Sequence, residues 1–179
     1  MKDSGEVSAL LVRPSSAQWL LVLGHGAGAG MAHPFMERLV VELANAGIAT
    51  LRYQFPYMEE RRRVPDKPEL LAATVAAAVC LAAETMPKLP LLAGGKSMGG
   101  RMTSQAAAEN LLGPVKGIVF FGFPLHPPNR PSTKRADHLA KVGVPMLFLQ
   151  GTRDTLADLT LLRPVCANLG AHATLHIIN

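Results

Sequence analysis

The chain has 179 residues, of which 49% are apolar, 17% charged and 5% aromatic, and its formal net charge is +5. This length suits one domain with a single core, and the apolar share excludes a disordered chain. Much of the excess positive charge sits in Arg61-Arg62-Arg63, beside two prolines and without aromatic residues or a nucleic-acid motif, which favours a solvated loop over a nucleic-acid interface.

Short apolar runs alternate with longer helical patterns along the chain, which predicts βαβ units and a mostly parallel sheet. The predicted strands are residues 7–12, 19–23, 48–55, 89–93, 115–121, 145–149 and 173–178, and the predicted helices are residues 35–46, 70–86, 100–112 and 156–169. The helix at 70–86 is apolar nearly all round, so we expect it to be well covered and Cys80 to pack inside. We expect a single α/β domain over residues 1–179, with helices on both faces of the sheet and no cap domain.

The sharpest motif is Gly95-Lys96-Ser97-Met98-Gly99, where an apolar strand meets the G-x-S-x-G pattern and a helix follows. Such a tight strand-to-helix turn requires a positive φ at the serine and small residues two positions before and after it. The turn raises the hydroxyl beside the N-terminus of the following helix, whose partial positive charge favours an oxyanion. The pattern predicts Ser97 as a nucleophile, and the alternative is a purely structural glycine turn.

Two phosphate-binding motifs fit the sequence less well. A Walker A loop ending in Gly95-Lys96-Ser97 would need glycine where Pro90 stands. The glycine loop at residues 24–30 loosely matches a dinucleotide fingerprint, but the next predicted strand ends in Arg52-Tyr53-Gln54 without an acid to hold a ribose. We therefore expect no cofactor, and the two cysteines do not form a metal-type cluster.

The glycine loop fits an oxyanion hole better, with the backbone N–H groups of Ala27 and Met98 as donors. The alternative is a flexible turn, since glycine-rich loops are common. We place His25 in the substrate pocket, although a histidine in such a loop often organises it by hydrogen bonds. Tyr57 and Phe123 follow the carboxyl ends of strands, so we expect them to line a shallow apolar cleft around Ser97, unless they pack on neighbouring rings.

A catalytic triad in the chain order Ser, acid, His requires a carboxylate after a later strand. Asp154 stands there, and Asp158 is the less favoured alternative, which we expect at the start of a helix. The histidine should follow the last strand, where the sequence stops at Asn179, whereas His176 lies inside that strand. At about 3.3 Å per residue, His176 falls roughly 7–10 Å below the level of Ser97. We expect the C-terminal histidine loop to be absent from this chain.

Together these residues resemble a small, cap-less family of α/β hydrolases related to the dienelactone hydrolases, which includes a testis-expressed hydrolase-like protein and a subunit of a histone-acetyltransferase complex. The likeness covers nearly the whole chain, through residues 24–28, 51–58, 94–101, 123–128 and 150–154. It implies an α/β-hydrolase fold, with Ser97 as nucleophile and Asp154 as triad acid. It also implies that a small-molecule ester or related acyl substrate is cleaved through a Ser-His-Asp triad and an acyl-enzyme. A non-catalytic hydrolase-fold interaction module is the alternative, as the complex subunit suggests.

The first six residues carry acids where a signal peptide needs a basic segment. The longest uncharged apolar run, residues 70–83, is shorter than the about 20 residues that cross a bilayer. We expect a cytoplasmic protein that binds neither nucleic acid nor membrane, and the sequence leaves its oligomeric state open.

Overall fold

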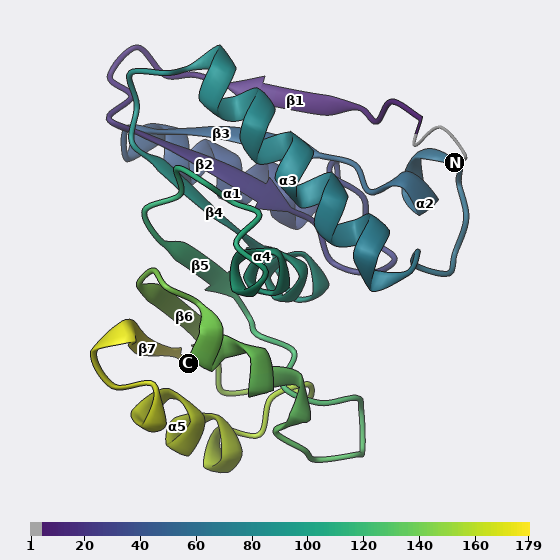
Figure 1. Ribbon diagram of the computed structural model, residues 1–179, viewed down its shortest axis with the longest axis vertical. Coiled ribbons are helices and arrows are strands. Elements are labelled where there is room, and N and C mark those ends of the chain that lie inside the picture. Colours follow the sequence, from purple (N-terminus) through teal and green to yellow (C-terminus); the bar gives the residue numbers. More distant parts are fainter. Residues whose placement is uncertain (1–4) are drawn as a thin grey trace.

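In the computed structural model, which describes residues 5–179, a seven-stranded sheet has the order β1-β3-β2-β4-β5-β6-β7 (Figure 1). All neighbouring strands are parallel except β1, which runs antiparallel to β3. The strands are β1 (Ala9–Val12), β2 (Trp19–Gly24), β3 (Ile48–Tyr53), β4 (Leu91–Lys96), β5 (Ile118–Phe121), β6 (Met146–Gly151) and β7 (Ala173–Ile178). The predicted α/β fold is confirmed; β7 has the predicted bounds, and those of the other strands differ from the predicted ones by a few residues.

Helices cover both faces of the sheet: α1 lies on one face, and α3, α4 and α5 lie on the other (Figure 1). The helices are α1 (Pro34–Asn45), α2 (Pro56–Glu59), α3 (Pro68–Thr85), α4 (Met98–Ala108) and α5 (Leu159–Asn168), with 3₁₀ helices η1 (Lys134–Lys141) and η2 (Gly170–His172). The sequence analysis did not predict α2 or η1. Both lie in loops that follow the carboxyl ends of strands, and η1 packs against α4.

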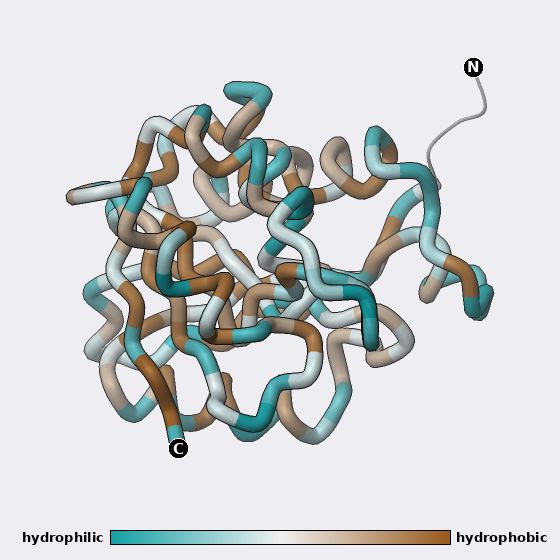
Figure 2. Tube along the Cα trace, turned by 90° about the horizontal axis from the view of Figure 1, so that it is seen from below, coloured by the Kyte–Doolittle hydropathy of each residue, from teal (hydrophilic) through white to brown (hydrophobic). Residues whose placement is uncertain are grey.

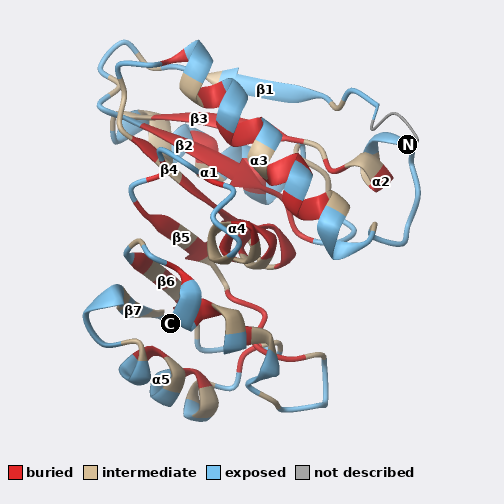
Figure 3. Ribbon diagram, viewed as in Figure 1, coloured by how far each residue is buried: buried red, intermediate tan, exposed pale blue. Residues whose placement is uncertain are grey.

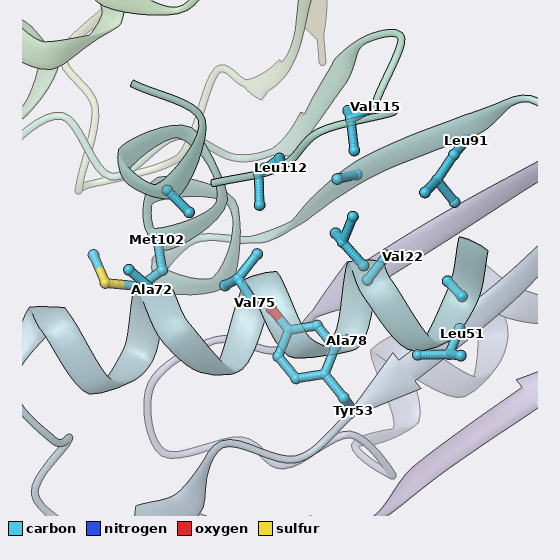
Figure 4. Close-up of a cluster of buried hydrophobic side chains, with 14 of the residues drawn as sticks. Val22, Leu51, Tyr53, Ala72, Val75, Ala78, Leu91, Met102, Leu112 and Val115 are labelled. Carbon is cyan, nitrogen blue, oxygen red and sulfur yellow. The ribbon is translucent and has the colours of Figure 1, made fainter. Parts of the chain in front are cut away.

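The central strands β2, β3 and β4 are buried on both faces, as their continuous apolar sequences require (Figure 3). On the α3 side, Val22, Leu51 and Leu91 of these three strands belong to one buried cluster with Val75 and Ala78 of α3 (Figure 4). This cluster fixes the height of the central strands and therefore the position of the loops at their carboxyl ends.

The strands β5, β6 and β7 alternate strictly between more and less buried residues. Phe120 and Phe148 point into the core, whereas Phe121 and Leu149 on the opposite face are only partly buried. Helix α1 packs beside β3 and leaves this half of the sheet less covered. The apolar strand β7 lies at the edge of the sheet and at the periphery of the fold (Figure 2).

Helix α3 corrects one expectation, because only one of its faces is covered (Figure 3). Leu71, Val75 and Val79 are buried, whereas Cys80 is exposed and Leu81 is 47% exposed. The many small alanines make the sequence apolar all round without requiring burial on every side. By length and hydropathy alone α3 also resembles a membrane-spanning helix, although its covered face packs on β2 and α4.

Candidate active site

Ser97 occupies the turn between β4 and α4 with φ 50° and ψ −114°. This confirms the predicted positive φ at a non-glycine residue between a strand and a helix. The flanking glycines permit the turn, because a Cβ on Gly95 or Gly99 would collide with the backbone of Gly24. Ser97 is half-buried, so its hydroxyl lies at the surface of the carboxyl edge of the sheet.

The glycine loop that follows β2 lies directly against this serine. A Cβ built on Gly26 would lie 3.9 Å from the Cβ of Ser97. The next residue, Ala27, is exposed, and its N–H makes no backbone hydrogen bond within the described residues. Met98 is the first residue of α4, where an N–H has no partner inside the helix. The two amides that the sequence assigns to an oxyanion hole are thus both free donors on elements that border Ser97.

His25 organises the glycine loop from below. Its Nδ1 lies 2.8 Å from the Gly26 carbonyl oxygen, and its Nε2 accepts from the Phe55 N–H at 3.1 Å. The second bond requires an unprotonated Nε2, so Nδ1 carries the proton and donates to Gly26. Burial is the main cause that lowers the pKa of His25, which keeps the ring neutral.

Strand β3 and the residue that follows it hold the far end of the same loop. Gln54 Oε1 accepts from the Met31 N–H at 2.9 Å, and Arg52 Nη1 donates to the Met31 carbonyl at 3.0 Å. A Cβ on Gly30 would lie 3.0 Å from the Gln54 amide, so a larger residue there would press on this side chain. The loop is therefore fixed at both ends before any ligand binds, which is the condition for a preorganised donor such as the Ala27 N–H.

Asp154 follows β6 and is held by two hydrogen bonds. Its Oδ2 accepts from Gln150 Nε2 at 2.8 Å, and its Oδ1 accepts from the Leu156 N–H at 2.9 Å. Gln150 is fully buried and also accepts from the Phe123 N–H at 2.8 Å. The alternative acid, Asp158, instead caps α5 by accepting from the Thr160 N–H at 2.8 Å. The carboxylate anchored beside the end of β5 is therefore that of Asp154.

None of the hydrogen bonds among the described residues joins a histidine to Ser97 or Asp154. His126 resembles His25: its Nδ1 lies 2.9 Å from the Pro127 oxygen, and its Nε2 accepts from the Asp158 N–H at 3.0 Å. His176 on β7 pairs in register with Leu149 of β6, before the carboxyl end of the strand. It is exposed on the edge strand β7, which is separated from β4 by the two strands β5 and β6.

One serine–histidine contact does occur, in a place that the sequence analysis missed. Ser104 Oγ lies 2.8 Å from His138 Nε2, between α4 and η1, and Ser104 Oγ also donates to the Arg101 carbonyl at 3.0 Å. Ser104 is fully buried in the middle of a helix, so a substrate cannot reach its hydroxyl. Burial, reinforced by the charge of Arg101, lowers the pKa of His138 to about 4. This pair joins two elements and does not resemble a nucleophile with its base.

The three side chains expected to line the substrate pocket, His25, Tyr57 and Phe123, have no exposed surface. The His25 ring lies 4.9 Å from Phe55 in an edge-to-face contact and 6.2 Å from Tyr57. Phe123 packs edge-to-face on Phe120 at 5.2 Å. In this structure they support the loops around Ser97 from beneath and do not line an open cleft, because aromatic rings gain more from mutual packing than from exposure to water.

Among residues 5–179, no three His, Cys, Asp or Glu side chains are grouped closely enough to hold a metal ion. The charged side chain nearest Ser97 in sequence is Lys96, whose Nζ lies 4.9 Å from the centre of the Phe35 ring at the start of α1.

Comparisons with known proteins agree with the fold. The family described as "Alpha/beta hydrolase domain" matches residues 17–179. A dienelactone hydrolase from Anabaena variabilis is similar in structure, with a TM-score of 0.80 and 23% identity, over 98% of this chain and 81% of that chain. An α/β serine hydrolase homologue from Coxiella burnetii has a TM-score of 0.78 and 14% identity, over 98% and 83% of the two chains. Est1E from Butyrivibrio proteoclasticus, solved with ferulic acid, has a TM-score of 0.73 and 16% identity, over 96% and 85%.

Proposed function

Since this chain belongs to the α/β hydrolase domain family, we propose that it is a serine hydrolase that cleaves an ester or related acyl bond of a small molecule. The observation that carries the proposal is the backbone of Ser97, a non-glycine residue with φ 50° between β4 and α4. Positive φ costs free energy at such a residue, and strain of this kind is concentrated at functional sites. A turn that served only to connect the two elements would have no need for a serine in this conformation.

In the proposed reaction, Ser97 Oγ attacks the acyl carbon while a base removes the hydroxyl proton. The negative charge that develops on the acyl oxygen is held by the N–H groups of Ala27 and Met98, aided by the N-terminus of α4. The bond to the leaving oxygen breaks, the leaving group takes up the proton, and an acyl-enzyme remains. Water then attacks the acyl carbon in the same way and releases the acid and free Ser97.

In this scheme Asp154 orients the imidazole that serves as the base and stabilises its protonated form. The hydrogen bonds from Gln150 and Leu156 support this role, because they fix both carboxylate oxygens at the edge of the sheet. His25, His126 and His138 are committed to other partners. We therefore propose that the residues described here hydrolyse esters slowly, and that an imidazole supplied from solution accelerates the reaction.

The proposal is tested by hydrolysis of 4-nitrophenyl acetate, with and without added imidazole. We expect imidazole to increase the Ser97-dependent rate by at least about tenfold, which is less than the roughly 10²–10⁴-fold that a positioned general base contributes. Ser97→Ala should remove this increase, and Asp154→Asn should reduce it. Ser104→Ala is the matched control, since Ser104 lies on the same helix but is buried. If Ser97→Ala and the wild-type chain respond equally to imidazole, the protein is a hydrolase-fold module without turnover.

A further inference from the structure

Two arginine side chains beside the candidate active site lack an acidic partner. Arg101 lies one helical turn after Ser97, and its N–H donates to the Ser97 carbonyl at 3.1 Å. Arg135 lies on η1, which packs against α4. Both residues are partly buried. Within residues 5–179 the only ion pairs between side chains are those of Arg62 with Glu60 and Asp66, so neither arginine has a carboxylate within salt-bridge distance.

The contact between Ser104 and His138 places the two arginines on facing surfaces. On α4, Arg101 stands three residues before Ser104, so both side chains lie on the same side of the helix. On η1, Arg135 stands three residues before His138, and side chains three apart are aligned in a 3₁₀ helix. The hydrogen bond of 2.8 Å between Ser104 and His138 therefore joins the faces of α4 and η1 that carry Arg101 and Arg135. The charge of Arg135 adds to the effect of burial in lowering the pKa of Arg101.

This arrangement leaves the positive charge of the two arginines uncompensated in a region that is only partly exposed to water. Arg101 Nε is buried and has no hydrogen-bond partner. Gln105 Oε1, one turn further along α4, is also buried without a partner. A bond between these two groups would satisfy one N–H but would not neutralise the guanidinium. The acids nearest in sequence, Asp137 and Glu109, are exposed and form no ion pair with either arginine. Like charges that are partly removed from water are costly unless an anion neutralises them.

Arg135 also contacts the loop that follows β5 and that contacts Ser97. Arg135 Nη1 donates to the Pro124 carbonyl at 3.4 Å. Gly122, two residues earlier in the same loop, accepts from the Ser97 N–H at 3.1 Å. The Arg135 guanidinium and Ser97 therefore both contact one short segment that follows β5, residues 122–124. A ligand that binds beside this segment at Ser97 is therefore close to cationic side chains.

We propose that Arg101 and Arg135 form a binding site for an oxyanion, a carboxylate or a phosphate, and that this anion is carried by the acyl substrate of Ser97. The planar guanidinium group presents paired N–H donors that match two oxygens of either anion. The second part rests on the proposed hydrolase function, whereas the anion site does not. The substrate class is then an ester or related acyl compound with an acidic group beyond the scissile bond.

Binding is tested on the full chain by following the arginine Nε–Hε signals in NMR spectra. The chain is titrated with glutarate and, separately, with inorganic phosphate at constant ionic strength, and neutral glutaramide serves as the control ligand. We expect the signals of Arg101 and Arg135 to shift with at least one of the two anions and with neither sodium chloride nor glutaramide. Arg101→Lys and Arg135→Lys assign the signals, and each should weaken binding by about tenfold. Arg61→Lys, in the exposed loop, is the matched control. Unshifted signals of Arg101 and Arg135, or equal binding by Arg101→Lys and Arg61→Lys, would overturn the site.

The source of the anion is tested by the imidazole-assisted hydrolysis of two esters, 4-nitrophenyl acetate and 4-nitrophenyl hydrogen glutarate. For a substrate-borne carboxylate, Arg101→Lys should raise KM for the glutarate ester by about tenfold and leave KM for the acetate ester unchanged. Equal KM values for both esters, in the wild type as in Arg101→Lys, would overturn this part, even if phosphate shifts the arginine signals. Anion binding without any Ser97-dependent hydrolysis would refute the proposed function and support the anion site alone.

Discussion

The carboxylate of Asp154 lies close enough to Gly122 that a Cβ on this glycine would be 3.1 Å from Oδ2. Gly122 has φ +77°, and its carbonyl oxygen accepts from the Ser97 N–H at 3.1 Å. One glycine therefore connects the candidate nucleophile with the candidate triad acid. A substitution at Gly122 is therefore expected to affect both Ser97 and Asp154.

We expect Gly122→Ala to destabilise the protein by about 1–2 kcal/mol because of the positive φ, and also to displace Asp154. Thermal unfolding and imidazole-assisted ester hydrolysis measure the two effects separately. Gly170→Ala is the matched control, because Gly170 has φ +58° and open space where the Cβ would stand. Both variants should lose similar stability, and only Gly122→Ala should also lose hydrolysis. Equal rates in the two variants would show that the contact with Asp154 has no bearing on the site.

A second prediction concerns Gln150, whose amide nitrogen donates to Asp154 at 2.8 Å. Gln150→Glu keeps an acceptor for the Phe123 N–H but places a second carboxylate against the first. The pKa of the pair should rise, because two adjacent carboxylates do not readily ionise together. A raised pKa in the folded state means that stability falls as pH increases above the unfolded pKa of about 4.

The variant should therefore be less stable than wild type by about 2 kcal/mol at pH 8, and by clearly less at pH 5. Urea unfolding at the two pH values measures the difference. Gln150→Met, which lacks both the donor and the acceptor of the amide, should show a loss that changes little with pH. A loss of equal size at both pH values in Gln150→Glu would contradict the close approach of the two carboxyl groups.

A third prediction concerns the pH dependence of stability that arises from His138. Its folded pKa of about 4 lies below the ordinary value of 6.5. The unfolded chain therefore binds the proton more strongly, and stability from this residue is lost as pH falls from about 6.5 to 4. His138→Gln retains a partner for Ser104 and should remove about 1–2 kcal/mol of this loss, a value reduced from the full shift because the ring is partly exposed.

Unfolding free energies of the wild type and His138→Gln at pH 7 and pH 4.5 give this difference. The exposed His172 provides the control substitution, His172→Gln, which should follow the wild type. If His138→Gln and His172→Gln lose the same stability over this pH range, then His138 is not buried against Arg101 and Ser104 as described.

Much of the sheet could be predicted from sequence because parallel strands are encoded by continuous apolar runs. The strand at residues 173–178 has the predicted bounds, and β4 proved to extend to Lys96, immediately before Ser97. The elbow was predictable since few sequences satisfy the close approach of Gly95 and Gly99 to Gly24. The turn requires small residues at fixed positions around the serine, so it can be recognised in the sequence.

The features that were missed depend on contacts between distant segments. Helix η1 has the sequence Lys-Arg-Ala-Asp-His-Leu-Ala-Lys, in which only Ala136 and Leu139 are buried, so it has too few apolar residues to stand out as a core-facing helix. The pairing of Ser104 with His138 spans 34 residues and follows from the packing of η1 on α4. The exposure of Cys80 was missed because an alanine-rich helix does not reveal which of its faces is covered.

The central claim, that Ser97 is an activated nucleophile, is tested most directly by reaction with an alkyl fluorophosphonate followed by peptide mass spectrometry. A bond forms between Oγ and phosphorus, and fluoride leaves with the hydroxyl proton transferred to the base. We predict that, in the presence of imidazole, the folded chain gains one phosphonyl group on Ser97. Ser97→Ala should gain none, and Ser104→Ala should react as the wild type does. An adduct on another residue, or a folded wild-type chain that reacts no more than Ser97→Ala, would contradict the assignment of Ser97.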